Sequence, residues 1–365
     1  MNYVGIDYHK AYSVVAAMNE RGQLLNEARI PGNSPVAFAQ FFNSLDGPAT
    51  AVLEGTRNWG YLYDLLHELP RMEDVQLANA YKLRVIAEAQ VKTDKIDARA
   101  LANLLRGDLI PRLHVPSPKN RCRKNVLRQR VFWVRQRTMI RNRVHTLVER
   151  QRGLSVPVLR DLFGKRGGDW LKGLTLAEPD ATLLRQDLAV MERLNEQLKE
   201  LDRMVCAGNR NDHTAELLQS LPGVGDFFAA VLAGEIDTID RFHSPAKLCA
   251  YAGLAPTTHA SGGKCYQGRL FGQCNRWMRW ALIEAGWVSI QCSSYFGELY
   301  RFHKARGKKS NQAIVIVARR LCEIAWHLLR ENRPYEERPV ALKMNFPGRS
   351  ESKVVESAGC PSRRT

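Results

Sequence analysis

The segment YVGIDYHKAYSVVAAMNERGQLLNEARI, residues 3–30, decides the fold of the first third of the chain. Its apolar residues gather in three short runs, at 3–7, 13–18 and 24–28. The polar sequence Asn19–Gly22, between the second run and the third, is typical of a turn. Three strands joined by connections this short form an antiparallel meander. The segment therefore predicts a three-stranded meander at the start of the chain.

The residues that follow alternate between helical and strand patterns. Elements are expected at 35–45 (helix), 49–54 (strand), 58–69 (helix), 75–78 (strand) and 94–105 (helix). The last helix carries its apolar residues on one side, at Ile96, Ala100, Leu101 and Leu104. A meander followed by alternating helices and strands is the element order of the α/β ribonuclease H-like (RuvC-like) fold. We expect this domain to span residues 1–111.

Composition excludes several classes of protein. With 365 residues and 45% apolar residues, the chain can bury ordinary cores in more than one domain. Its apolar stretches are too short to span a bilayer, so no membrane association is expected. The eight cysteines contain no CxxC pair, which is typical of reduced thiols in the cytoplasm. The formal net charge of +17 indicates a polyanionic partner, usually nucleic acid.

The positive charge is concentrated just after the first domain. Residues 1–111 carry 11 Lys and Arg against 13 Asp and Glu, whereas residues 119–152 carry 12 cations and only Glu149. Apolar residues recur at helical spacing through this basic segment. A solvated helix face is one interpretation, but cations without counter-charge repel one another. We therefore expect a basic helix that contacts nucleic acid through Arg128, Arg135 and Arg141.

A second long helix is predicted downstream of the basic segment. Its apolar residues step by an average of 3.5 positions, at Leu184, Leu188, Met191, Leu194, Leu198, Leu201 and Val205. This spacing is typical of a coiled-coil seam. The alternative is a helix that faces the core of a bundle. We expect residues 112–213 to form a basic helix and a coiled-coil dimerisation region.

The remaining sequence predicts a mostly α C-terminal domain over 214–335 and a flexible tail over 336–365. Leu221-Pro-Gly-Val-Gly225 lies between helical patterns and is typical of a helix-hairpin-helix turn. Gly223 and Gly225 would let backbone N–H groups approach a phosphate at a helix N-terminus. A plain turn between packed helices is the alternative.

Four acidic residues are candidates for metal binding. Asp7 and Glu54 end predicted strands, and Asp94 and Asp97 lie one helical turn apart on the same face of a helix. Each has a simpler role available, such as helix capping for Asp94. Together, acids from two strands and one helix converge at a sheet edge and favour Mg²⁺ or Mn²⁺. Such a site is suited to phosphodiester cleavage.

A glycine-rich segment in the C-terminal domain presents a serine. Ser261 precedes Gly262, Gly263 and Lys264, and this pattern predicts an exposed hydroxyl on a flexible loop near a phosphate. Further contacts to nucleic acid are expected from Arg269 and Arg276. His259 is the nearest candidate for a general base. An ordinary surface loop remains the alternative.

These motifs, in this order, resemble those of DEDD-type insertion-sequence transposases and the related Piv-type DNA invertases. The matching stretches are Val4–Lys10, Leu53–Gly55, Lys92–Arg99, Leu221–Gly225, Leu254–Pro256, Ser261–Lys264 and Asn275–Arg276. The resemblance implies that Asp7, Glu54, Asp94 and Asp97 are the DEDD metal ligands. It also implies that Ser261 joins covalently to a DNA 5′-phosphate.

The resemblance further implies partners and a location. A structured guide RNA would pair with donor and target DNA, and a homodimer through the coiled coil would assemble into a tetramer at synapsis. The protein would be associated with the nucleoid of a bacterium or an archaeon. The expected function is a DNA transposase or recombinase. Alternatives are a RuvC-like junction nuclease that uses water, a site-specific invertase, and a nucleic-acid-binding protein without catalysis.

Overall fold

The computed structural model describes residues 1–56, 58–86, 94–261, 264–270 and 272–337, with only the backbone for 84–86, 258–261 and 264–267. The chain divides into two compact units, Met1–Pro116 and Ser117–Thr365. The predicted tail at 336–365 lies almost wholly outside the described residues. The first unit continues past residue 111 because Leu113 donates its backbone N–H to the carbonyl of Leu77 and packs on the core. The division of the second unit into predicted domains at 213 and 335 stays a prediction.

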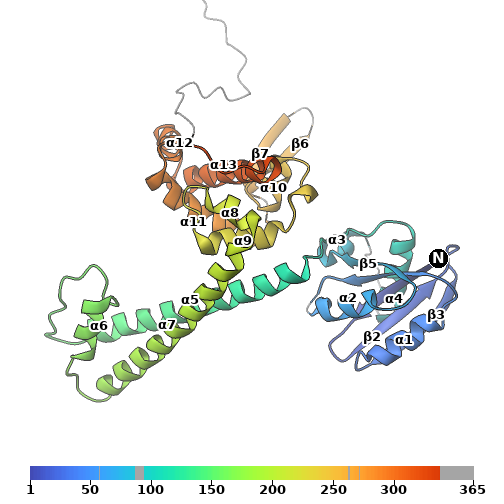
Figure 1. Cartoon of the computed structure of the whole chain (residues 1–365), viewed down its shortest axis with the longest axis horizontal. Coiled ribbons are helices and arrows are strands. Elements are labelled where there is room, and N and C mark those ends of the chain that lie inside the picture. The colour runs from blue at the N-terminus through green and yellow to red at the C-terminus, as the bar shows by residue number, and fades with distance from the viewer. Residues whose placement is uncertain (57, 87–93, 262–263, 271, 338–365) are drawn as a thin grey trace, which may run out of the picture. The chain divides into compact units, whose positions relative to one another are not determined.

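A mixed five-stranded sheet forms the centre of the first unit (Figure 1). Its strands are β1 (Asn2–Tyr8), β2 (Tyr12–Met18), β3 (Leu24–Pro31), β4 (Ala49–Glu54) and β5 (Met72–Ala78). Their order across the sheet is β3-β2-β1-β4-β5. The first three strands pair antiparallel, and β4 pairs parallel with both β1 and β5. This topology fits the predicted ribonuclease H-like fold.

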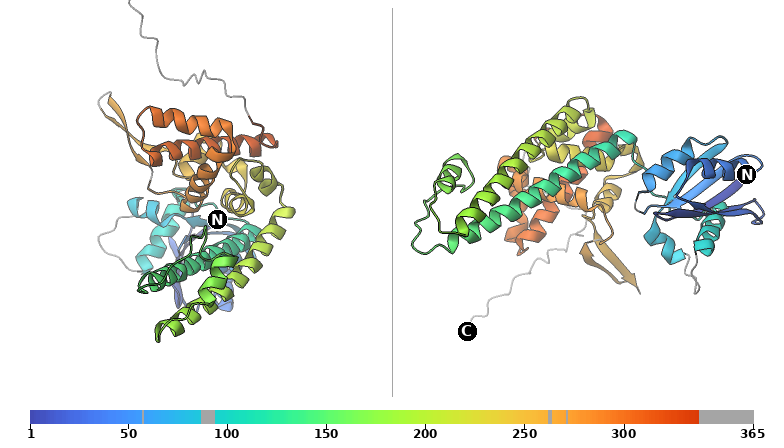
Figure 2. Two further views of the ribbon diagram at one scale, coloured as in Figure 1. Left: turned by 90° about the vertical axis from the view of Figure 1, so that its left-hand side faces the viewer. Right: turned by 90° about the horizontal axis from the view of Figure 1, so that it is seen from below.

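Helices cover both faces of the sheet (Figure 2). Helices α1 (Pro35–Asn43) and α2 (Trp59–His67) pack on one face, where Val4 and Ile6 of β1 meet their apolar side chains. Helix α4 (Asp94–Arg106) packs on the other face, against side chains such as Val52 of β4. A short helix that the sequence analysis did not predict, α3 (Ala80–Ile86), follows β5. The alternation of strand side chains thus decides which residues face α4.

Two long helices of the second unit form an antiparallel hairpin (Figures 1 and 2). They are α5 (Pro118–Glu149), which contains the predicted basic helix, and α7 (Asp180–Arg210), with α6 (Lys165–Lys172) between them. Six of the seven predicted seam residues of α7, all except Leu201, are buried within this one chain. Leu184, for example, packs with Val144 of α5. Within one chain α5 therefore packs on this seam, as in the bundle alternative, and dimerisation stays a prediction.

The rest of the second unit is mainly helical, as predicted. Its elements are α8 (His213–Gln219), α9 (Asp226–Ile236), the 3₁₀ helix η1 (Ile239–Arg241), α10 (Pro245–Tyr251), α11 (Arg276–Cys292), α12 (Ser294–Ala305) and α13 (Ser310–Glu331). Their apolar faces share one core, which also includes Leu127 of α5 and Val205 of α7. A hairpin of β6 (Pro256–Ser261) and β7 (Lys264–Leu270) interrupts the helices. Within the described parts of the chain, no helix is both long and apolar enough to cross a membrane.

Candidate functional site

Strand alternation places Asp7 and Glu54 side by side on the α4 face of the sheet. In β1, Ile6 faces the α1–α2 side, so the next residue, Asp7, faces α4. In β4, Leu53 faces the α1–α2 side, and Glu54 follows it. The strands are parallel, and Ile6 is opposite Leu53 in their register. The two acids therefore occupy neighbouring strand ends on the same face.

Helix α4 supplies the other two predicted acids from its first turn. Asp94 and Asp97 lie on the side of α4 that continues into the buried residues Ala98 and Leu101. This side packs directly on β1 at Gly5, where an added Cβ would lie 2.1 Å from the backbone oxygen of Ala98. A glycine is thus required for the helix to come this close to the strand. The close approach brings the N-terminus of α4 to the strand ends.

The structure brings all four predicted acids into one open pocket of about 590 Å³. The lining residues are Asp7, Tyr8, His9, Lys10, Glu54, Thr56, Asn58, Asp94 and Asp97. Their side chains come from β1, from β4 with the residues after it, and from α4. The convergence of acids at one edge of the sheet, which the sequence predicted, is therefore present in the structure.

Two residues that contact the predicted acids, His9 and Tyr12, are not among the residues predicted for the site. His9 Nε2 lies 3.0 Å from Asp7 Oδ2 and 3.5 Å from Asp94 Oδ1. The Tyr12 hydroxyl donates a hydrogen bond of 2.7 Å to Asp94 Oδ2. A signal for His9 was available, because a residue two positions after Asp7 in an extended chain lies on the same face. Tyr12 gave no such signal, since its contact depends on how α4 docks.

The pocket shifts the pKa values of two of its acids in opposite directions. Burial raises the pKa of Asp7, and the charges of Asp94 and Asp97 raise it further, against a lowering effect of His9. The hydrogen bond from Tyr12 holds the pKa of Asp94 below its ordinary value. A divalent cation bound among these oxygens would relieve the repulsion felt by Asp7. The hard carboxylate donors therefore fit Mg²⁺ or Mn²⁺.

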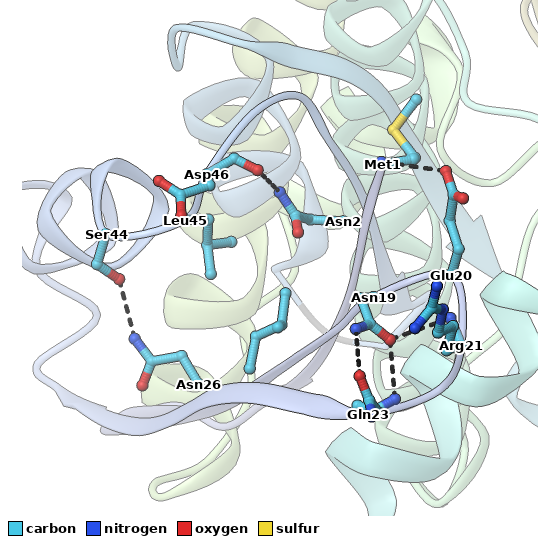
Figure 3. A pocket seen from close by; sticks show the side chains of 11 residues that line it. Met1, Asn2, Asn19, Glu20, Arg21, Gln23, Asn26, Ser44, Leu45 and Asp46 are labelled. Carbon is cyan, nitrogen blue, oxygen red and sulfur yellow. Dashed lines mark hydrogen bonds and ion pairs between the residues drawn. The ribbon is translucent and has the colours of Figure 1, made fainter.

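A second hollow of about 590 Å³ lies at the N-terminal end of β1 (Figure 3). It contains none of the predicted site residues. Its polar groups largely satisfy one another: Asn26 donates to Ser44, and Asn19 donates to Gln23. The Met1 ammonium pairs with Glu20 at 3.2 Å. The carboxylate pocket is therefore the better candidate for chemistry.

Ser261 occupies a different local structure from the one expected. Instead of a flexible loop, its backbone forms the last residue of β6 and pairs with Lys264 of β7. Gly262 and Gly263 lie outside the described residues, and the side chains of Ser261, Lys264 and His259 are likewise not described. The strand pairing fixes the serine backbone near the hairpin end, which a loop would not do.

The two glycines of the Leu221–Gly225 turn have different roles. At Gly223, φ is +81° and an added Cβ would lie 2.3 Å from the backbone oxygen of Ala285 in α11. This glycine is therefore explained by packing alone. Gly225 has open space around its Cβ position and is the N-cap of α9. Of the two, only Gly225 has room for a phosphate at its backbone, although Asp226 beside it adds a negative charge.

The basic helix α5 has counter-charges that its own sequence does not show. Acids from later in the chain pair with its cations, in the pairs Arg123–Asp212, Lys124–Glu235, Arg128–Glu235, Arg130–Asp202, Arg143–Asp187 and Arg150–Asp180. The expectation of uncompensated cations is therefore wrong for these six, because their acidic partners lie 30 to more than 100 positions further along the chain.

The remaining predicted arginines differ in their surroundings. The Arg141 guanidinium lies 4.9 Å from the Phe163 ring, and its Nε is buried. Arg135 is exposed and forms no ion pair with any residue that the structure describes. Arg269 of β7 and Arg276, the first residue of α11, are also exposed. Arg135, Arg269 and Arg276 are thus the predicted cations most available to a polyanion.

Comparison with known proteins identifies the family. A family model described as "Transposase", DEDD_Tnp_IS110, matches residues 4–151, which contain the carboxylate pocket and α5. A second, "Transposase IS116/IS110/IS902 family", matches residues 215–301, which contain Ser261. The chain belongs to the IS116/IS110/IS902 transposase family. The predicted family resemblance is confirmed.

Individual curated relatives align over different lengths of the chain. A 44.8 kDa protein of insertion element IS116 from Streptomyces clavuligerus is 28% identical over 44% of this chain and 41% of its own length. The transposase for insertion sequence element IS1328 from Yersinia enterocolitica is 23% identical over 88% of this chain and 95% of its own. A pilin gene-inverting protein from Moraxella bovis is 30% identical over 40% of this chain and 47% of its own length. The chain thus spans less than half of the first and third relatives.

Proposed function

We propose that this family member is a DNA transposase that cuts and rejoins DNA at the ends of an insertion sequence. The observation that carries the proposal is the convergence of Asp7, Glu54, Asp94 and Asp97 in one pocket from β1, β4 and α4. Acids gathered from separate elements at the cost of mutual repulsion are explained by a bound cation rather than by folding stability.

The pocket residues have distinct tasks in this proposal. Asp7 and Glu54 are held by the sheet, whereas Asp94 and Asp97 are held by the docked helix α4. A Mg²⁺ or Mn²⁺ ion bound by these carboxylates would neutralise charge on the scissile phosphodiester and assist its cleavage. Tyr12 keeps Asp94 ionised and oriented through its hydrogen bond. Lys10, which also lines the pocket, is placed to attract the DNA backbone.

Ser261 is proposed to be the nucleophile. Its Oγ attacks a DNA phosphorus, the bond from phosphorus to the 3′ oxygen breaks, and the proton lost from Oγ ends on that leaving oxygen. A 5′-phosphoserine results, and a DNA 3′-hydroxyl then displaces the serine and reforms the phosphodiester. Bond energy is conserved in the ester, so rejoining needs no external energy source. The family resemblance and the hairpin position of Ser261 support this role.

Nucleic-acid partners follow from the distribution of charge. Residues 1–116 carry 12 Lys and Arg against 13 Asp and Glu, so the remaining chain holds a net charge of +18. We propose that this second unit binds donor and target DNA and a structured guide RNA, with Arg135, Arg269 and Arg276 among the contacts. The homodimer and the synaptic tetramer stay part of the proposal. A dimer would use surfaces other than the buried α7 seam.

A site-specific invertase is the second candidate, because 40% of this chain aligns with a pilin gene-inverting protein. The chemistry would be the same, and only the arrangement of the DNA sites would differ. A RuvC-like junction nuclease would instead use water and need no serine ester.

The proposal is tested by DNA cleavage and strand joining with purified full-length protein and labelled element ends. Asp7→Asn, Glu54→Gln, Asp97→Asn and Ser261→Ala should each lower the rate by roughly 10²-fold or more. Asp46→Asn is the matched control, because it removes an acid at the hollow of Figure 3, and it should stay within about twofold of wild type. Full activity of the three carboxamide variants would contradict the proposed site.

A further inference from the structure

The imidazole of His9 lies between two carboxylates of the pocket. Its Nε2 is 3.0 Å from Asp7 Oδ2 and 3.5 Å from Asp94 Oδ1. One donor atom from each of the three residues lies within 4.8 Å of the others. Neighbouring ligand atoms around a six-coordinate cation with bonds near 2.1 Å are separated by roughly 3 Å. The three donor atoms therefore lie at spacings that one cation can bridge.

The position of His9 is fixed by the surrounding chain. His9 directly follows β1, and its backbone N–H donates to the carbonyl of Tyr12 at 3.0 Å. Its own carbonyl accepts a 2.8 Å hydrogen bond from Asn33 Nδ2, and Asn33 in turn accepts one from the buried Ser13 hydroxyl. These bonds hold the turn between β1 and β2 in one conformation. The backbone from which the His9 ring reaches the pocket is thus held in place.

The ring of His9 is also held by aromatic contacts. The centroid of the His9 ring lies 4.9 Å from that of the Tyr12 ring. The Arg29 guanidinium in turn lies 3.9 Å from the centroid of the Tyr12 ring. The Tyr12 hydroxyl donates to Asp94 Oδ2, which leaves Oδ1 facing His9. Tyr12 therefore orients two of the three donors together.

We propose that His9 is a nitrogen ligand of the cation in this pocket, and that the donor set Asp7–His9–Asp94 makes the site select Mn²⁺ over Mg²⁺. This inference rests on the proposed function, in which the pocket binds a divalent cation. Magnesium prefers oxygen donors and retains its water, whereas manganese accepts an imidazole more readily. A purely carboxylate site would lack this reason to discriminate between the two ions.

The experiment measures metal binding by the full-length protein without DNA. Isothermal titration with Mn²⁺ and with Mg²⁺, at one pH near 7.5, compares wild type with His9→Ala and His9→Gln. His243→Ala is the matched control, since it removes an exposed imidazole in the other unit. Thermal unfolding in EDTA establishes that each variant is folded. Pulsed electron paramagnetic resonance of bound Mn²⁺ reports directly on a nitrogen ligand.

Wild type should bind Mn²⁺ at least about tenfold more tightly than Mg²⁺ and should show nitrogen modulation of the Mn²⁺ signal. Both His9 variants should lose about tenfold or more in Mn²⁺ affinity, less than about threefold in Mg²⁺ affinity, and the nitrogen modulation. His243→Ala should match wild type. Where His9→Ala is not folded in EDTA, His9→Gln alone decides the outcome.

Two other outcomes would overturn the inference. Unchanged Mn²⁺ binding and nitrogen modulation in the His9 variants would show that the imidazole is not a ligand. Tighter binding of both metals in those variants would show that His9 acts as a competing counter-charge. Metal binding by Asp7→Asn distinguishes either of these results from a failure of the proposed function, in which the pocket binds a cation. If Asp7→Asn abolishes binding of both metals, the pocket holds a cation whatever His9 does. If Asp7→Asn binds both metals like wild type, the pocket itself is not the metal site.

Discussion

Gly5→Ala is expected to damage the carboxylate pocket without altering any of its acids. The new Cβ would lie 2.1 Å from the backbone oxygen of Ala98, 2.5 Å from the backbone nitrogen of Ala102 and 2.8 Å from Cβ of Leu101. Ordinary contact begins near 3.4 Å, so α4 must retreat from β1 by about 1.3 Å. Because two of these contacts are to helix backbone, no side-chain rotation can relieve them.

Overpacking of this kind costs about 1–3 kcal/mol, and we expect the upper end of that range. For a unit of this size, the thermal midpoint should fall by roughly 5–15 °C. A displacement of about 1 Å of Asp94 and Asp97 should also lower the cleavage rate by up to roughly 10²-fold.

The assay combines thermal unfolding of the first unit with DNA cleavage at a temperature where the variant is folded. Gly208→Ala in α7 is the matched control, since no atom of the described residues lies within 4 Å of its Cβ position. It should be neutral or raise stability by up to about 1 kcal/mol. A Gly5→Ala protein with an unchanged midpoint and a cleavage rate within twofold of wild type would refute the argument that close packing of α4 positions the acids.

Three further predictions concern charge. Burial raises the pKa of Asp7 above its unfolded value, so its ionisation at pH 7 opposes folding. In EDTA, Asp7→Asn should therefore have a melting temperature equal to or above that of wild type. A series of melts across pH should show that this gain in melting temperature shrinks as the pH falls through the raised pKa. Glu235→Ala leaves Lys124 and Arg128 without their buried partner and should cost about 3 kcal/mol in denaturant titrations, whereas exposed Glu196→Ala should cost little. Arg135→Glu should weaken RNA binding and reduce the slope of log affinity against log salt by about 1, with unchanged protein stability. Arg128→Glu should also destabilise the protein, because Arg128 pairs with Glu235. Equal stability of the two variants would contradict a stabilising role of the Arg128–Glu235 pair.

The sequence predicted the sheet well because strand signals are local. Short apolar runs located all five strands, and the position of Asp7 and Glu54 at the ends of two of them predicted that these acids would meet. For α4 the predicted apolar side is only partly the buried side, since Leu101 is buried and Leu104 packs on the core. Ile96 is 37% exposed, whereas Ala98 and Ala102 are fully buried. Hydrophobicity favoured the larger side chains, but the close approach at Gly5 admits only small ones, and that requirement depends on tertiary packing.

The partners of long helices could not be predicted from their own sequences. The seam of α7 has coiled-coil spacing whether its partner is a second copy or α5 of the same chain, and the structure shows α5. The acids that pair with the cations of α5, such as Asp212 and Glu235, are distant from it in the sequence and come close to it only in the folded chain. For the β6–β7 hairpin a signal did exist, since Gly262-Gly263 between two short polar runs is typical of a two-residue turn.

The central claim is that this transposase-family protein cleaves DNA through a covalent ester on Ser261 with help from the carboxylate pocket. Its most direct test is to incubate wild-type protein with Mg²⁺ or Mn²⁺ and a suicide substrate nicked near the cleavage point, and to map any trapped adduct by mass spectrometry. The account predicts a DNA 5′-phosphate on the peptide that contains Ser261, absent from Ser261→Ala and from Asp7→Asn. Normal cleavage by wild type with no adduct at any time, or an adduct on another residue, would contradict it.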